Sequence, residues 1–487
     1  MSGTKPRHSS RAWGWWVALL LAAYLLRLAG ITAQGMWRDE VDALRFATAP
    51  WGDLLASFTR PGWNGPFYFF LLRFWAAGAG KSAFALRYFS LLWALPSLPL
   101  LFLLGRRLVK EAACIAVILF AAAPYLVWYA QEVKMYTMVP TLVLLALYAL
   151  ERAARGGRGW WWLVLAATSL AFYTHILAAL LVAVEVVWYV LIPRRAPGAW
   201  KGAALTLAGL TLPYLPLLRW ELPLLMQHRE TGYPALTLWT MVQILVNGWS
   251  SGIVGRYATY AAFLFITLLL AGTGALLVRR PRAALRLWAW MTLPLLAVWL
   301  VSLRGPIFTD RYLIWSAPAY LLLVAAGWSL LHREARRVAA VVLAILLVLD
   351  GVNIVAQAQQ PIKPQFEQAA AYVATHRAPD EPLLFQIPYN HFVFDYYYTD
   401  PLAPWLGAPY TNWLTDDGTY LIDEGQLDEQ MRELLHGVRS LWLIYSEADL
   451  YDARELVRHW LDAHARLDRV QRFYGVTVFH YTFETPP

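Results

Sequence analysis

The sequence predicts an α-helical polytopic membrane protein that carries an α/β domain at its C-terminal end. Three observations lead to this fold class. Of the 487 residues, 59% are hydrophobic and 15% are charged, whereas soluble proteins have roughly 25% charged residues. Long apolar segments recur as far as residue 355. The charge then changes sign, because residues 1–359 hold 32 basic and 13 acidic side chains and residues 360–487 hold 9 and 19.

Eleven segments approach the roughly 20 apolar residues that a membrane-spanning helix needs. The first is interpreted as a retained helix, because it is too long for the apolar part of a cleaved signal peptide and lacks a small-residue cleavage site. Only Thr174 and His175 separate the fifth segment from the sixth. The expected spans lie near residues 13–31, 84–104, 112–130, 135–151, 160–173, 175–193, 200–219, 258–278, 284–302, 310–331 and 336–355.

The loops between these segments alternate in charge. If the N-terminus is cytoplasmic, every inner loop is rich in Arg or Lys, which is typical of cytoplasmic loops. The outer loops hold acidic and aromatic residues. The first of them, residues 32–83, contains two segments too short to span, 41–47 and 66–77, which we expect to be surface helices in the membrane interface. The pattern predicts a multi-pass protein of the plasma (inner) membrane with an extracytoplasmic C-terminal domain.

We expect two domains: a transmembrane domain over residues 1–359 and a soluble, extracytoplasmic α/β domain over residues 360–487. The absence of a basic, aromatic-interleaved motif argues against nucleic-acid binding, and the absence of a P-loop or GxGxxG loop argues against a nucleotide-driven pump. The single Cys114 excludes an intrachain disulfide and a cysteine-based metal site. In the C-terminal domain the patterns predict helices over 365–376 and 452–464 and strands over 382–387, 440–445 and 476–483.

Ionisable residues gather at the outer ends of several predicted helices, where such groups are costly and often functional. Asp39 and Glu40 begin a predicted surface helix in "WRDEVDALRFA", and Asp39 there would also suit a helix cap. Snorkelling, a salt bridge or a helix-end hydrogen bond would explain each of the others singly, but not why all lie on one side. These other residues are Glu132 and Lys134 in "YAQEVKMY", His175 in "FYTHIL" and Arg311 in "FTDRYLIWSAPAY".

This combination suits the transfer of a sugar from a polyprenyl phosphate to a hydroxyl group. A carboxylate just outside the bilayer can act as general base on the acceptor hydroxyl. Neighbouring cations can stabilise the phosphate leaving group, which needs no general acid. The lipid tail of the donor would place this reaction at a membrane surface.

The motifs resemble those of the GT-C-type integral membrane glycosyltransferases of family 39, which include protein O-mannosyltransferases and the bacterial aminoarabinose transferases of lipid A. The resemblance extends over about residues 10–355. It is carried by "WRDEVDALRFA" (37–47), the segment 64–108 that begins "NGPFYFF", "YAQEVKMYTM" (129–138), "YTHIL" (173–177) and "DRYLIWSAPAYLLL" (310–323).

The resemblance implies an inverting transferase in which Asp39 is the catalytic base and Glu40 its neighbour. It further implies that the donor phosphate or the acceptor is bound by Glu132, Lys134, His175 and Arg311. The family often has His or Asp before Pro-Pro where this chain has "NGP", and no His or acidic residue lies between residues 59 and 83. We therefore expect no required metal or cofactor, although Asp39, Glu40, Glu132 and His175 could assemble an oxygen and imidazole site.

Two other classes of function stay open: a transporter or lipid flippase of cell-envelope assembly, and a non-catalytic scaffold. Transporters usually place ionisable groups near the bilayer midplane, often in broken helices of repeated halves. Here the charges within the predicted helix cores are Arg27, Glu185 and Asp350, which no repeat relates. The expected partners are a polyprenyl-phosphate-linked sugar donor, membrane lipids and an acceptor that the sequence does not identify.

Overall fold

Contacts divide the chain into two units. The membrane unit consists of residues 1–31 and 46–359, and the C-terminal unit of residues 32–45 and 360–487. Residues 32–45, which the sequence analysis placed in the transmembrane domain, thus group with the C-terminal residues. The computed structural model describes residues 8–59, 64–216, 219, 233–398, 400, 403–413 and 420–487.

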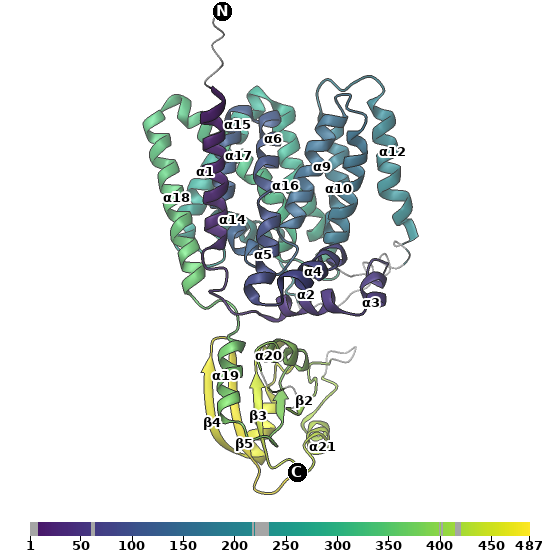
Figure 1. Ribbon diagram of the computed structural model, residues 1–487, viewed down its shortest axis with the longest axis vertical. Helices are drawn as coiled ribbons and strands as arrows, with labels where there is room; N and C mark the ends of the chain where they lie inside the picture. The colour runs from purple at the N-terminus through teal and green to yellow at the C-terminus, as the bar shows by residue number, and fades with distance from the viewer. Residues whose placement is uncertain are drawn as a thin grey trace, which may run out of the picture. The chain divides into compact units, whose positions relative to one another are not determined.

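The membrane unit consists mainly of long helices that run side by side (Figure 1). Each of the eleven expected segments overlaps at least one helix. In chain order these are α1 (His8–Leu28), α5 (Ala83–Ala94) with α6 (Ser97–Leu108), α7 (Ala113–Ala122) with α8 (Pro124–Ala130), α9 (Met138–Ala153), α10 (Trp160–Thr174), α11 (Leu181–Leu191), α12 (Ala199–Thr211), α15 (Ala258–Arg279), α16 (Pro281–Ser302), α17 (Ala317–Glu334) and α18 (Arg336–Gln359). A further helix, α14 (Leu238–Ser251), precedes α15.

Fewer than eleven helices among the described residues meet the length and apolar composition that a membrane span requires. Among the described residues, five helical segments are long and apolar enough to cross a membrane, or six if the bent pair formed by residues 110–122 and α8 is one span. The chain is therefore a multi-pass membrane protein, and the number of eleven spans stays a prediction. Part of the segment expected over 200–219 lies outside the described residues.

Proline and glycine shape this bundle. Pro124 begins α8 after a bend of 55°, because proline lacks the N–H that would continue α7. Gly272 of α15 and Gly327 of α17 face each other's backbones so closely that a Cβ at either position would collide with a backbone atom of the other helix. Small residues allow such close helix contacts in membranes.

Two short helices of the first expected outer loop, α3 (Trp51–Ala56) and α4 (Pro66–Ala79), lie at one end of the long helices (Figure 1). Helix α4 covers the segment expected over 66–77. Gly65 precedes it with φ of 84°, and a Cβ there would press against the side chains of Met135 and Phe69. Helix α2 (Arg38–Thr48) covers the segment expected over 41–47.

The C-terminal unit contains a five-stranded sheet in the order β2-β1-β3-β5-β4. Strand β1 is parallel to both β2 and β3, whereas β5 is antiparallel to β3 and β4. The carboxyl ends of β1, β2 and β3 therefore share one edge of the sheet. The elements are α19 (Phe366–His376), β1 (Leu383–Phe385), α20 (His391–Asp395), β2 (Trp405–Gly407), α21 (Glu424–Leu434), β3 (Ser440–Tyr445), α22 (Leu456–His464), β4 (Arg466–Phe473) and β5 (Val476–Thr482).

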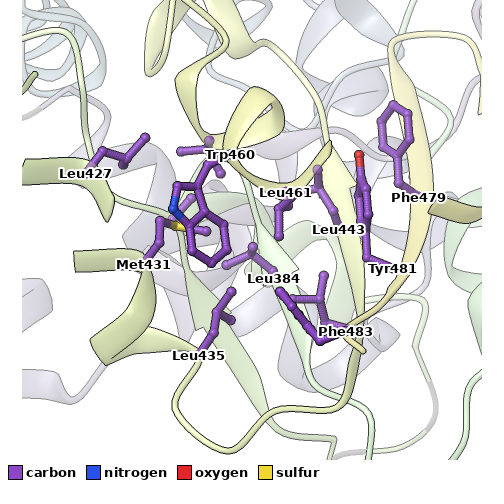
Figure 2. Close-up of a cluster of buried hydrophobic side chains, with 13 residues drawn as sticks. Leu384, Leu427, Met431, Leu435, Leu443, Trp460, Leu461, Phe479, Tyr481 and Phe483 are labelled. Atoms are coloured by element: carbon purple, nitrogen blue, oxygen red, sulfur yellow. The ribbon is translucent and has the colours of Figure 1, made fainter. Parts of the chain in front are cut away.

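A hydrophobic core joins α21 and α22 to the sheet. Figure 2 shows Met431 of α21 and Trp460 of α22 beside Leu384 of β1. A capping box begins α21, since the side chain of Asp423 accepts the N–H of Gln426 and the Gln426 side chain returns a bond to the Asp423 backbone. Each such cap stabilises a helix by about 1 kcal/mol.

The expected strands over 382–387, 440–445 and 476–483 contain β1, β3 and β5. The helix expected over 452–464 begins later, at Leu456, because the carboxylate of Asp452 accepts the N–H groups of Leu456 and Val457 at 3.0 and 2.9 Å. The sequence analysis missed β4. This edge strand is mostly exposed and reads "RLDRVQRF", so it lacks the apolar alternation that reveals a half-buried strand.

Candidate active site

Asp39 and Glu40 lie in the first turn of α2, within the C-terminal unit. The helix begins at Arg38, and the carbonyl of Trp37 accepts the N–H groups of Glu40 and Val41 at 3.0 and 3.1 Å. Asp39 is therefore a first-turn residue, not the cap residue that the sequence analysis suggested. Its carboxylate at a helix N-terminus is electrostatically favourable, and the side chain is half-buried.

Glu40 forms a buried ion pair with Lys363. The Nζ atom of Lys363 lies 2.9 Å from Oε2 of Glu40, and the two side chains are 5% and 0% exposed. The ammonium also lies 5.9 Å from the ring centre of Trp37. Such a pair needs both partners, because either charge alone would be buried without compensation. Sequence reasoning missed Lys363, and no local pattern could reveal a partner 323 residues away.

Further contacts hold the segment 32–45 within the C-terminal unit. The side chain of Gln34 donates to the carbonyl of Gln360 at 2.7 Å and accepts the N–H groups of Ile362 and Lys363 at 3.1 and 3.4 Å. The hydroxyl of Tyr397 accepts the N–H of Met36. The segment is thus fixed on the N-terminal side of Asp39.

Two contacts fix the other part of this segment. Arg38 forms an ion pair of 3.1 Å with Glu447, which follows β3. Arg45 places its guanidinium 3.0 Å from the ring centre of Phe392 in α20. The first turn of α2 is consequently attached to a residue that follows β3, and its last turn to a residue that follows β1.

In the membrane unit, Glu132 and Lys134 share a turn that follows α8. The carbonyl of Glu132 accepts the N–H of Lys134 at 2.8 Å, and Glu132 is buried whereas Lys134 is half-buried. His175 directly follows α10 and directly precedes the 3-10 helix η2 (Ile176–Leu180). Its Nδ1 accepts the N–H of Leu177 at 3.2 Å, which caps η2. The side chain of Asn64 accepts the N–H of Ile176, the residue before Leu177, at 3.0 Å.

Arg311 lies in a second 3-10 helix, η4 (Asp310–Ser316), immediately before α17. Its guanidinium is 5.9 Å from the ring centre of Tyr136. The ring centre of His175 lies 4.9 Å from that of Tyr312 and 6.5 Å from that of Tyr136. The ring of Tyr136 therefore lies near both Arg311 and His175, and Tyr312, the next residue after Arg311, also lies near His175.

Electrostatic interactions complete this neighbourhood. The charges of Arg311 and Lys134 both act on the His175 ring. The charges of Glu132 and Arg311 both act on the Tyr129 hydroxyl. The structure thus brings together the four residues Glu132, Lys134, His175 and Arg311, which we call the cationic cluster. The Nε2 atom of His175 is buried and has no hydrogen-bond partner in the described part of the chain.

Sequence reasoning missed Asp310 near this cluster. The hydroxyl of Tyr129 donates to its carboxylate at 3.5 Å. The position of Asp310 next to Arg311 in "DRYLIW" could have identified Asp310 as a candidate site residue. Across the described ranges, no group of three or more His, Cys, Asp or Glu side chains is arranged to hold a metal ion.

The charged residues within the helix cores have separate environments. Arg27 donates to the carbonyls of Phe120 and Ala121 at 3.3 and 2.9 Å, at the end of α7. Glu185 accepts the hydroxyl of Thr168 at 2.6 Å, and Asp350 is buried in α18. No hydrogen bond or ion pair in the described structure joins any two of Arg27, Glu185 and Asp350. This separation does not favour the transporter alternative.

The helical bundle and the sheet unit are similar in fold to solved structures of GT-C membrane glycosyltransferases. The family model described as dolichyl-phosphate-mannose-protein mannosyltransferase matches residues 60–220. A search of curated protein sequences finds no match. The family match and the structural similarities below confirm the resemblance stated from the motifs.

Several solved structures are similar over almost the whole chain. The structure of ArnT from Cupriavidus metallidurans in the apo state has a TM-score of 0.62 and 15% identity, and the similarity covers 97% of this chain and 98% of that chain. ArnT bound to undecaprenyl phosphate has a TM-score of 0.60 and 14% identity, covering 96% and 98%. The apo oligosaccharyltransferase of Archaeoglobus fulgidus has a TM-score of 0.57 and 11% identity, covering 97% and 74%.

Proposed function

We propose that this protein transfers a sugar from a polyprenyl-phosphate donor to a hydroxyl group on the outer face of the plasma membrane, with inversion at the sugar. The cationic cluster is the observation that carries this proposal. It gathers two cations, a histidine with an open nitrogen and a buried acid within a GT-C fold. The similar ArnT structure with bound undecaprenyl phosphate supports a lipid-phosphate donor.

In this proposal Arg311 and Lys134 bind the donor phosphate. A guanidinium can hold two phosphate oxygens at once, and an ammonium adds a mobile point charge. Both stabilise the negative charge that develops on the phosphate as the bond to the sugar breaks. The open Nε2 of His175 supplies one further hydrogen bond to the donor, and Glu132 balances the charge of the cluster.

Asp39 is proposed to remove the proton from the acceptor hydroxyl as this oxygen attacks the sugar. The first turn of α2 holds Asp39 next to Glu40, which the buried ion pair with Lys363 immobilises. Glu40 is consequently an anchor for the base rather than a second base. No cofactor or metal enters this mechanism. The C-terminal unit is proposed to be extracytoplasmic and the N-terminus cytoplasmic.

Purified protein in lipid nanodiscs tests this function. We would supply undecaprenyl phosphates that carry radiolabelled mannose, glucose, arabinose or aminoarabinose, with an envelope extract as acceptor source. Asp39→Asn should abolish transfer and leave insertion and donor binding intact. Asp42→Asn is the matched control, because Asp42 lies in the same helix and pairs only locally, at 2.8 Å, with Arg45. Normal transfer by the Asp39 variant, or no transfer by the wild type from any donor, would overturn the proposal.

A further inference from the structure

The carboxyl edge of the parallel strands carries two exposed aromatic side chains, Tyr389 and Trp413, and two half-buried ones, Tyr410 and Tyr451. Tyr389 follows β1, Tyr410 and Trp413 follow β2, and Tyr451 follows β3. Strand β1 lies between β2 and β3. The chain passes from β1 to β2 on one side and later forms β3 on the other side of β1, so the strand order reverses at β1. In open α/β sheets, ligands bind outside the carboxyl ends of the strands at such a switch point.

We call these four side chains, which follow the carboxyl ends of β1, β2 and β3, the aromatic edge. The ring centre of Tyr410 lies 5.1 Å from that of Trp413 and 4.6 Å from that of Tyr451. Tyr389 directly precedes Asn390, whose side-chain amide donates to Ser446 in the loop between β3 and Tyr451. Tyr389 is 64% exposed and Trp413 is 60% exposed. Large aromatic side chains gain much by burial, so their exposure at a ligand-binding edge indicates that a ligand covers them.

A second observation at the same switch point also indicates a ligand. Gln386 and Asn390, in the loop after β1, are 0% and 1% exposed. The amide of Asn390 donates to the hydroxyl of Ser446 after β3 at 2.7 Å. The carbonyl oxygens of both side chains have no hydrogen-bond partner in the described structure. Unpaired buried acceptors are rare and call for a donor.

The chemistry of this edge fits a saccharide. Sugar rings present C–H faces that stack on aromatic rings and hydroxyl groups that donate to acceptors without a partner. An anionic ligand is disfavoured, because Glu447 and Asp449 lie in the loop after β3. The cation nearest in sequence, Arg454, is held by the carbonyls of Thr411 and Ile422 at 2.9 and 2.6 Å.

The aromatic edge is connected to the proposed base within the C-terminal unit. Glu447, four residues before Tyr451, pairs with Arg38, and Arg38 precedes Asp39 in α2. We propose that the aromatic edge binds the saccharide part of the acceptor and presents its hydroxyl toward Asp39. This inference rests on the proposed function for its catalytic meaning, whereas saccharide binding at the edge can be tested without catalysis.

Saccharide binding to full-length protein in nanodiscs, without donor, tests the inference. The probes are disaccharides of glucose, mannose, galactose, arabinose and N-acetylglucosamine, measured by saturation-transfer NMR and titration. We expect at least one to bind, and we expect Trp413→Ala and Tyr451→Ala to weaken it about tenfold, as loss of one aromatic contact does. Tyr474→Ala is the control, because Tyr474 is similarly exposed at 48% but lies in the β4–β5 turn.

The outcomes separate this inference from the proposed function. Saturable binding that the two edge variants weaken, with the control unchanged, supports the aromatic edge even if Asp39→Asn stays active, in which case only the base assignment fails. Binding by no member of the panel, or equal binding by all variants, overturns the inference. In the transfer assay the edge variants should raise the acceptor KM while hydrolysis of the donor by water stays unchanged.

Discussion

Replacing Lys363 by Met would test whether the C-terminal unit positions the proposed base. Methionine has a similar length and no charge, so Glu40 would stay buried without its partner. Because the two side chains are 5% and 0% exposed, solvent screening offers little compensation. Breaking one side of a buried pair costs about 3–5 kcal/mol. We expect this cost to fall on the first turn of α2, since the Gln34 and Arg45 contacts still hold the segment's ends.

Hydrogen exchange measured by mass spectrometry on peptides covering residues 32–48 would detect this change. A cost of about 3 kcal/mol corresponds to roughly 100-fold faster exchange of these amides. Transfer activity should fall with it. The double variant Glu40→Gln/Lys363→Met should recover part of the protection, because it removes the buried charge that Lys363 no longer balances. Unchanged exchange in Lys363→Met, or a double variant that is no better than the single, would refute the reasoning.

Three further predictions concern other parts of the chain. Arg311→Lys should raise the KM for the lipid donor about tenfold, the cost of a charge-assisted hydrogen bond, with the acceptor KM unchanged. Gly327→Ala should destabilise the bundle by about 1–3 kcal/mol, seen as a lower melting temperature, because its methyl group meets the backbone of Leu268. Burial favours a higher pKa for Glu381, but hydrogen bonds such as that from His480 lower it overall. The stabilisation should therefore be present above about pH 4.3 and be lost as the pH falls, with faster exchange in β5.

Controls and contrary outcomes accompany these predictions. Arg304→Lys, at an exposed position before η4, should leave the donor KM unchanged. Gly351→Ala should be harmless, since a Cβ there meets open space. Equal melting temperatures for the Gly327 variant and the wild type would contradict the tight crossing of α15 and α17. Acid sensitivity of β5 that survives Glu381→Gln would contradict the role of this carboxylate.

Local patterns predicted much of the fold and part of the site. Hydropathy located a helix in each expected segment, and the acids of "WRDE" correctly marked a helix N-terminus. The gathering of Lys134, His175 and Arg311 was expected because the loop pattern places all three at helix ends on the same side of the bundle. The side of the membrane and the role of Asp39 stay predictions.

Long-range pairing explains what the sequence could not reveal. The partner of Glu40 comes from a segment that the domain boundary seemed to separate from it, so Lys363 and the grouping of residues 32–45 stayed hidden. Strand β4 was missed because exposed charges conceal an edge strand. The aromatic edge was hidden for the same reason as Lys363, because its members follow three different strands that only the sheet brings together.

The discontinuous C-terminal unit has a consequence for biosynthesis. Glu40 leaves the ribosome 323 residues before Lys363. At about 5–20 residues per second, the interval is roughly 16–65 seconds, during which the whole membrane unit is made and inserted. The segment that carries Asp39 therefore waits unpaired until the last quarter of the chain emerges. A chain that ends before Lys363 cannot form this ion pair, so the proposed sugar transfer would require synthesis to pass that residue.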